Sequence, residues 1–218
     1  MQVRPPVRRA PSLRALGALA LVAGLLAGGC APLVMGGAVV GGALVAVDRR
    51  TSGTQIEDQA IELKAASRIR STVAERGHVN VTSYNRAVLL TGEAASDADR
   101  AAIEQAVRGV ENVRSVINEL AVMGSSSMTS RSNDTLVTAR VKAAFVEAKD
   151  LQAHVVKVVT ERGTVYLMGR VTEREASRAT DLARGVNGVL KVVRVFEILT
   201  EAELAALSPG GAPPSPPK

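Results

Sequence analysis

Few side chains in this chain are of the types that do acid–base, nucleophilic or metal chemistry. They are two histidines, one cysteine and one close acidic pair: His78, His154, Cys30, Asp97 and Asp99. A single cysteine excludes an internal disulfide framework and a cysteine-rich zinc site, and two histidines are too few for a histidine-based metal cluster. Each histidine falls in a predicted helix-to-strand turn, and the acidic pair falls where a helix N-terminus favours carboxylates. The sequence therefore predicts no catalytic residue, no metal site and no cofactor.

Cys30 has a different context. Arg4, Arg8 and Arg9 precede an apolar run from Leu13 to Ala27 that only Arg14 interrupts. This arrangement is typical of an export signal, here over residues 1–29. The small residues before Cys30 resemble a bacterial lipobox, although the usual leucine is displaced by one position, to Leu26. The resemblance implies that Cys30 is acylated and becomes the new N-terminus. An uncleaved N-terminal anchor and a buried cysteine are the alternatives.

Part of the positive charge of the chain belongs to the expected export signal. The chain has 27 Lys and Arg against 21 Asp and Glu, a formal net charge of +6 and a pI near 10.0, values that suggest a nucleic-acid or membrane partner. Residues 1–29 hold four arginines and no acid, so 23 basic and 21 acidic residues follow them, a net of +2. Aromatic residues make up only 2% of the chain, which disfavours a base-stacking surface. A nucleic-acid partner is therefore not expected.

An internal repeat organises the rest of the sequence. Residues 79–81 and 88–92 recur 77 positions later as 156–158 and 165–169, and Arg-Gly-Val at 108–110 recurs at 184–186. We expect a glycine-rich tether over 30–53, one domain over 54–123, a serine-rich linker over 124–133, a second domain over 134–199 and a disordered proline-rich tail over 200–218. The tether is short for a membrane span, although Gly37 and Gly41 have the spacing of a helix-packing motif.

Each copy shows the pattern of a helix, two strands, a second helix and a third strand. In the first copy Ile61, Ala65, Ile69 and Val73 form an apolar helical stripe. Strands are predicted over 79–83, 87–91 and 113–122, with a hairpin at residues 84–86 and a second helix whose inner side would carry Ala98, Ala102, Ile103 and Ala106. Ser96 or Asp97 is expected to cap that helix.

This order, the strand-ending glycines Gly92 and Gly169, and the repeated Arg-Gly-Val resemble the BON domain, an αββαβ unit with two helices on one face of a three-stranded sheet. Behind a lipobox, two such units resemble the dual-BON outer-membrane lipoproteins over residues 30–199. The fold class expected is therefore α+β, with two tandem BON domains. Ala31 stands where an aspartate favours inner-membrane retention, which points to the outer membrane and a periplasm-facing protein. The resemblance also implies anionic phospholipid binding by the second domain and roles in division and envelope integrity.

The two copies differ in charge. Residues 54–123 carry 8 basic and 10 acidic residues, whereas residues 130–199 carry 12 basic and 8 acidic residues. In the first helix of the second copy, predicted over 135–148 with a cap at Asn133 or Asp134, Val137, Val141 and Phe145 mark the core face. Leu136 lies off that face, on a side shared with Arg140, Ala143 and Glu147. An isolated exposed leucine or a contact with the first domain would also explain Leu136.

The resemblance places the phospholipid-binding residues on this helix, at Leu136, Arg140 and Ala143. The predicted partner is a membrane that contains anionic phospholipid, either phosphatidylglycerol or cardiolipin, with envelope-assembly or division proteins as further partners. A non-enzymatic protein is expected. The rival hypothesis is a periplasmic adaptor or chaperone-like module in which the acidic first domain contacts proteins.

Overall fold

The computed structural model describes residues 48–74 and 77–207. Residues 47–218 form one compact unit. The expected export signal, Cys30, residues 30–47 of the expected tether and residues 208–218 of the expected tail lie outside the described residues. In the part of the chain that is described, no helix is both long enough and apolar enough to cross a membrane.

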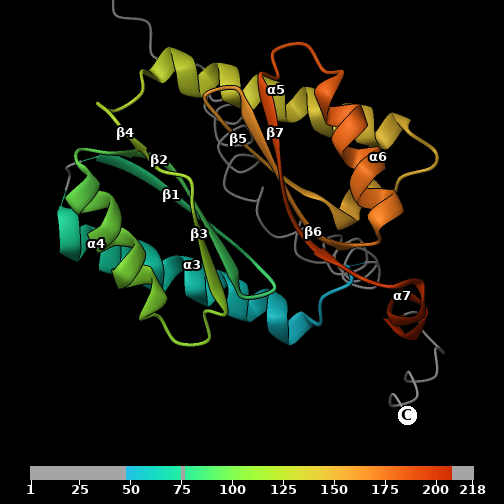
Figure 1. Cartoon of the computed structure of the whole chain (residues 1–218), viewed down its shortest axis with the longest axis horizontal. Coiled ribbons are helices and arrows are strands. Elements are labelled where there is room, and N and C mark those ends of the chain that lie inside the picture. Colours follow the sequence, from blue (N-terminus) through green and yellow to red (C-terminus); the bar gives the residue numbers. More distant parts are fainter. Residues whose placement is uncertain (1–47, 75–76, 208–218) are drawn as a thin grey trace, which may run out of the picture. The chain divides into compact units, whose positions relative to one another are not determined.

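The two repeats fold with the predicted order of elements (Figure 1). The first contains α3 (Ser52–Val73), β1 (Gly77–Tyr84), β2 (Ala87–Ala94), α4 (Asp97–Arg108), β3 (Ser115–Asn118) and β4 (Ala121–Val122). The second contains α5 (Met128–Glu147), the 3-10 turn η1 (Ala153–Val155), β5 (Lys157–Glu161), β6 (Thr164–Val171), α6 (Glu173–Arg184) and β7 (Lys191–Ile198), and α7 (Glu201–Leu207) follows it. The predicted α+β class with two tandem αββαβ domains is confirmed.

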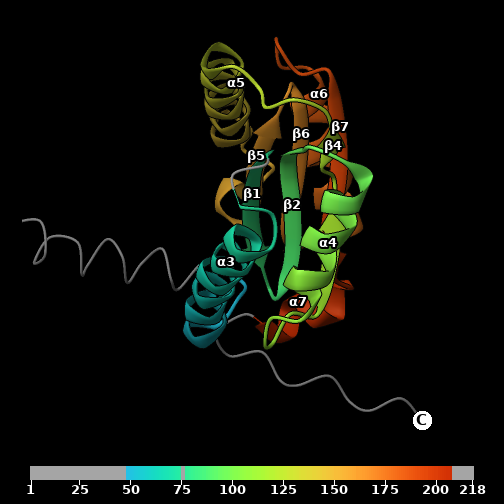
Figure 2. The ribbon, with the colours of Figure 1, turned by 90° about the vertical axis from the view of Figure 1, so that its left-hand side faces the viewer.

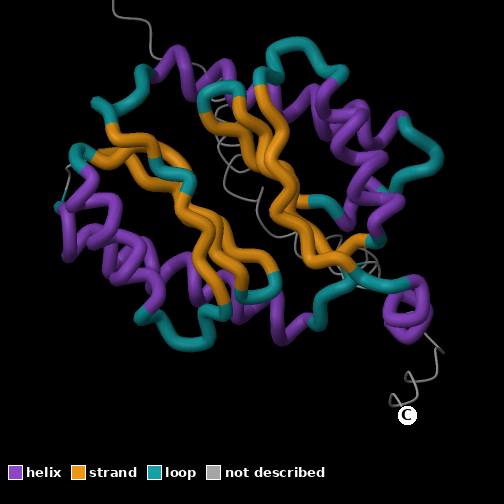
Figure 3. Tube along the Cα trace, in the orientation of Figure 1, coloured by secondary structure: helices purple, strands orange, loops and turns teal. Residues whose placement is uncertain are grey.

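Each sheet has its most apolar strand in the centre. β2 pairs antiparallel with β1 and parallel with β3 and β4, and β6 pairs antiparallel with β5 and parallel with β7. Both helices of a repeat cover one face of its sheet (Figures 2 and 3). Successive strand residues point to opposite faces, so Val88 and Leu90 pack under α3 and α4 while Leu89 points away. The predicted stripe from Ile61 to Val73 is buried as expected.

Several predicted boundaries were wrong because polar residues proved to be helical. The serine-rich linker ends earlier than expected, since α5 begins at Met128 with Ser127 as its N-cap, rather than near Thr135. Inside α5, the Ser132 and Thr135 hydroxyls donate to the carbonyl oxygens of Met128 and Arg131, at 3.0 Å each. Serine and threonine that bond back to their own helix do not need to break it. Asp134 is therefore not a cap but lies within the helix.

Other expected loops are also ordered. The expected linker at 48–53 contains the start of α3, capped by Thr51, and the expected disordered tail contains α7. α7 begins with a capping arrangement in which the Thr200 hydroxyl accepts from Glu203 N and the Glu203 carboxylate accepts from Thr200 N. The third strand of the first repeat is interrupted between β3 and β4, where Asn118 bonds to Leu120 N. In α4 the buried residues are Ile103 and Val107, while Ala98 is exposed.

The sheet faces that are free of helices share one apolar cluster. It is formed by Tyr84 and Leu89 of the first domain and Tyr166 and Met168 of the second, all buried. β2 and β6 are therefore buried on both faces, which explains why they read as continuous apolar runs.

Charged pairs link the domains around this cluster. Arg162 donates to Glu93 at 2.7 Å and to Gly92 O at 3.0 Å, and the Glu93 side chain is fully buried. Glu197 accepts from Asn85 and Arg114 of the first domain and from Arg170 of its own. The two domains thus dock through both apolar and ionic contacts.

Acidification is expected to weaken this docking. Burial alone would raise the pKa of Glu197, but hydrogen bonds from Arg114, Asn85 and Arg170 outweigh it and lower the pKa. The pKa of Glu93 is lowered in the same way, by Ser126 and Arg162 against burial. Because both folded-state values lie below the unfolded value of about 4.3, this stabilisation is complete above that pH and is lost as pH falls through the folded values. Thermal unfolding over a pH series should show this loss, and Glu197→Gln should reduce it. An equal slope in wild type and variant would contradict the assignment.

Candidate functional site

α5 is held in place by a buried carboxylate. Asp134 accepts hydrogen bonds from Arg162 N and Gly163 N, each at 2.8 Å, in the turn between β5 and β6. Both turn residues have positive φ, 48° and 71°, the conformation of a tight hairpin turn that twists with its strands. A single carboxylate therefore fixes the N-terminal half of α5 against the sheet.

The first domain repeats this device. Asp58 of α3 accepts from Asn85 N and Arg86 N at 2.8 Å each and from the Ser83 hydroxyl at 2.7 Å. We did not predict either role from the sequence. The signal was present: Asp58 and Asp134 are 76 positions apart, and the turns they bind are 77 apart.

The three predicted site residues all lie on the exposed side of α5. Leu136 is 55% exposed, and Arg140 and Ala143 are exposed as well. Val137, Val141 and Phe145 form the buried side, as predicted. The Arg140 guanidinium donates to Asn187 O at 3.4 Å, a contact within the second domain. The exposure of Leu136 shows that this side chain lies outside the core of the second domain, as predicted.

The exposed face extends beyond these three residues. At 100° per residue, Ala139 and Val146 fall on the same face as Leu136 and Ala143, and Val146 is 74% exposed. Lys142 borders this strip on the side opposite Arg140. Ala139 and Val146 could have been found from the sequence by projecting every residue of α5 at 100° per residue. That projection shows apolar residues on two faces of α5 rather than one.

The cations on α5 differ in their surroundings from the other cations of the domain. Most arginines elsewhere in the second domain pair with carboxylates: Arg162, Arg170, Arg178, Arg184 and Arg194. Among the described residues of the second domain, Arg131, Arg140, Lys142, Lys149, Arg174 and Lys191 make no ion pair. Two of these cations, Arg140 and Lys142, border the apolar strip of α5.

The first helix of the first domain provides an internal comparison. α3 also exposes large apolar residues, with Ile56 at 69% and Leu63 at 74%. Lys64, which corresponds to Arg140 in the repeat, pairs with Glu111 at 2.7 Å. α3 thus exposes apolar surface in a domain of net negative charge. Lys64, the equivalent of Arg140, is paired with a carboxylate there.

The candidate catalytic residues serve local structure. Asp97 and Asp99 lie in the first turn of α4, where Ser96 is the N-cap and its hydroxyl accepts from Asp99 N, as expected. His154 is exposed in η1. Within the described ranges, no group of three or more histidine, cysteine or acidic residues is arranged to hold a metal ion.

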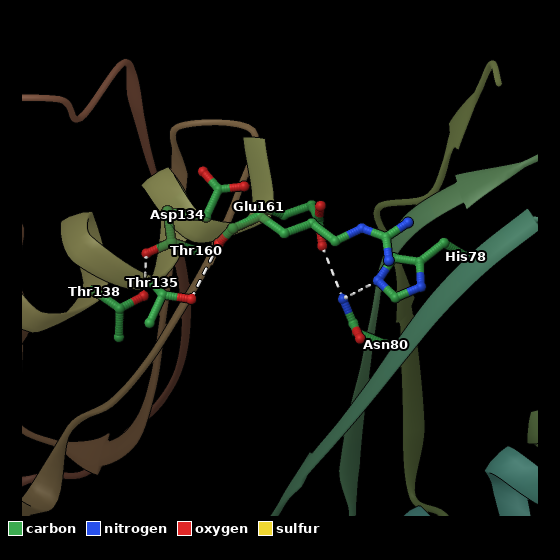
Figure 4. Close-up of a pocket in the computed structure, with 8 residues that line it drawn as sticks. His78, Asn80, Asp134, Thr135, Thr138, Thr160 and Glu161 are labelled. Carbon is green, nitrogen blue, oxygen red and sulfur yellow. Dashed lines mark hydrogen bonds between the residues drawn. The ribbon is translucent and has the colours of Figure 1, made fainter. Parts of the chain in front are cut away.

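His78 lines a polar pocket of about 280 Å³ between β1 and β5 (Figure 4). Asn80 donates to Glu161 at 3.0 Å and lies 3.4 Å from the His78 ring, and Thr138 donates to Thr160 at 2.7 Å. Figure 4 shows Asn80 between His78 and Glu161, and Thr138 against Thr160, so these side chains have partners within the protein. We therefore assign this pocket to domain docking rather than to chemistry.

Comparison with known proteins gives two family matches and several relatives. Residues 57–124 and 133–200 each match the family model of the BON domain. The chain is 38% identical over 184 residues to the outer membrane lipoprotein DolP of Haemophilus influenzae, which covers 84% of this chain and 95% of that protein. It is 32% identical over 152 residues to the 21 kDa hemolysin of Actinobacillus pleuropneumoniae, which covers 69% of this chain and 78% of that protein. It is 29% identical over 144 residues to the osmotically-inducible protein Y of Escherichia coli, with 64% and 72% covered.

Proposed function

The chain belongs to the BON-domain family as a DolP-like protein with two such domains, and we propose that it is an outer-membrane lipoprotein whose second domain binds anionic phospholipid through α5. In this proposal Cys30 carries the acyl anchor and the domains face the periplasm. The protein has no enzymatic role. Support of envelope integrity, including at division sites, is the cellular function we propose with it.

The exposed face of α5 is the observation that carries the proposal. Leu136, Ala139, Ala143 and Val146 form a strip of modest apolar area, bordered by Arg140 and Lys142, which make no ion pair with the described part of the chain, and by the exposed Glu147. An interfacial helix has this arrangement, with apolar side chains that enter the acyl boundary and cations that meet phosphate. Each Lys or Arg near an anionic surface contributes about 1 kcal/mol, screened by salt.

The acyl anchor and α5 would act together. A chain tethered by its lipid presents the second domain to the same leaflet at high effective concentration, so weak contacts at α5 suffice for attachment. The affinity of α5 itself is therefore best measured without the anchor. Residues 47–218 form a compact unit and lack Cys30, which makes them the suitable protein for this measurement.

Charge reversal on α5 should weaken binding strongly. Residues 47–218 are expected to co-sediment with phosphatidylglycerol vesicles at low salt and not with phosphatidylcholine vesicles. Arg140→Glu replaces attraction by repulsion, a change of about 2 kcal/mol or about 30-fold in affinity, and Leu136→Glu should have a similar effect through lost burial and added repulsion. Cardiolipin vesicles in parallel test the headgroup preference.

The repeat supplies matched controls for both variants. Lys64→Glu and Leu63→Glu introduce the same charges on exposed sites of α3 and should leave binding nearly unchanged. The proposal fails if the wild type does not bind anionic vesicles, or if the α3 variants reduce binding as much as the α5 variants do.

One observation favours a second role for the first domain. Ile56 and Leu63 lie seven residues apart on α3, hence on one face, and both are largely exposed. A protein partner in envelope assembly is the alternative function that this surface supports. Loss of such a partner on Leu63→Glu, with vesicle binding intact, would establish it as a separate activity.

A further inference from the structure

The connection between α6 and β7 carries the most exposed large apolar side chain among the described residues. Leu190 is 82% exposed, more than Leu136 or Val146 of α5. A fully exposed leucine on a disordered loop would need no explanation. Leu190 is different because its backbone is fixed.

Two hydrogen bonds connect this loop to α5 through the neighbouring hairpin. Leu190 N donates to Gly163 O at 2.8 Å, and Gly163 N donates to the Asp134 carboxylate at 2.8 Å. The chain of contacts thus runs from the loop through the β5–β6 turn to α5. The exposed leucine is held by the same carboxylate that positions the helix.

The loop also touches α5 directly. The Arg140 guanidinium donates to Asn187 O, and Gly188 lies so close to the helix that an added Cβ would be 2.9 Å from Val137 Cγ2. Gly188 has φ of +97°, a conformation that side chains disfavour. In Figure 1 the connection into the start of β7 passes beside α5, in agreement with these contacts. The loop between α6 and β7 therefore lies next to Arg140 and next to the helical turn of α5 that contains Leu136.

Two cations flank Leu190. A hollow of about 340 Å³ is lined by Arg184, Val189, Leu190, Lys191 and Val192. The Arg184 guanidinium lies 3.7 Å from Asp181, and both side chains are more than 60% exposed, at 64% and 69%, so the pair is weak. Apolar walls with two accessible cations suit a phosphate group attached to an acyl chain.

We propose that the α6–β7 loop is a second membrane contact, in which Leu190 enters the acyl boundary while Arg184 and Lys191 receive the headgroup phosphate. The inference rests on the proposed function and enlarges its surface from one helix to a helix and a loop. Two apolar anchors on separate elements, each beside unpaired or weakly paired cations, set the orientation of the domain on the leaflet. One helix alone leaves rotation about its axis free.

The test uses residues 47–218, phosphatidylglycerol vesicles and Leu190→Gln, which keeps side-chain size and adds no charge. We expect about tenfold weaker binding, and about fivefold weaker binding for Lys191→Gln. Leu63→Gln on α3 is the matched control and should bind as the wild type does. Unchanged thermal unfolding shows that each variant is folded.

The outcomes separate this inference from the proposed function. If Leu190→Gln and Lys191→Gln bind as the wild type does while Arg140→Glu does not bind, the loop contact is refuted and the α5 site stands. If the wild type ignores anionic vesicles, both proposals fail. If the protein binds glycerol phosphate in solution, loses this binding on Lys191→Gln, and binds vesicles unchanged on Leu190→Gln, the hollow is a site for free phosphate esters, and the membrane contact is refuted.

Discussion

Replacement of Gly92 by alanine is expected to unfold the first domain, or to destabilise it by about 4 kcal/mol. Gly92 has φ of +110°, and an added Cβ would overlap His78 O and lie 3.0 Å from its carbonyl carbon. Both atoms belong to the backbone of β1, which pairs with β2 along eight residues. Neither strand can move away without loss of this ladder. Gly92 O also accepts from Arg162, so the domain contact would suffer as well.

Thermal unfolding of Gly92→Ala beside Gly124→Ala measures this effect. Gly124 has no atom within 4 Å of an added Cβ, so its replacement should shift stability by less than about 0.5 kcal/mol. A Gly92→Ala protein with wild-type stability would show that β1 and β2 are further apart than described. Gly169 is the equivalent of Gly92 in the second repeat. A side chain at this position would clash with the backbone, because an added Cβ would lie 2.5 Å from Val155 O.

Asp58→Ala should have a comparable effect, a loss of about 4 kcal/mol. The Asp58 carboxylate is buried and accepts from Ser83, Asn85 N and Arg86 N, and it pairs with Arg50 at 2.8 Å. Burial would raise its pKa, but these hydrogen bonds lower it, so the charged form is favoured in the fold. Alanine leaves the hairpin turn donors without their acceptor and removes one of the two carboxylates that pair with Arg50, the other being Asp48.

Chemical denaturation is the suitable measurement for this variant. Asp58→Asn should recover little, because each carboxylate oxygen accepts two hydrogen bonds and an amide nitrogen would face donors. Asp97→Ala, at an exposed site in the first turn of α4, is the control and should cost about 0.5 kcal/mol. Equal stability of Asp58→Ala and Asp97→Ala would contradict the assigned role.

The repeat made most of the fold predictable. The helical stripe on α3 and the Ser96 cap occur where the pattern placed them. Gly92 and Gly169, which were expected to end their strands, lie inside β2 and β6, because each strand continues for two more residues. These are local features, each set by periodicity or by one cap. The start of α5 could not be placed, because Ser132 and Thr135 satisfy their hydroxyls on the helix itself, and composition alone does not distinguish this from a linker.

The candidate site was predictable only in part. Leu136, Arg140 and Ala143 were found by angular position, and the structure places all three on one exposed face. Leu190 was not found, because its neighbourhood with α5 depends on contacts between residues far apart in sequence: Asp134 with Gly163, and Gly163 with Leu190. Domain docking likewise depends on which face of β2 meets which face of β6. Such pairings belong to tertiary structure and leave no local signal.

The most direct measurement of the central claim uses the absence of tryptophan from this chain. Leu136→Trp in residues 47–218 places a single fluorescent reporter on the exposed face of α5, and Leu63→Trp places one on α3 as its control. With phosphatidylglycerol vesicles that carry quenchers on the acyl chains, we expect the Leu136→Trp emission to shift to shorter wavelength and to be quenched, and the Leu63→Trp emission to stay unchanged. No shift and no quenching at Leu136→Trp, or equal quenching at both sites, would contradict lipid binding through α5.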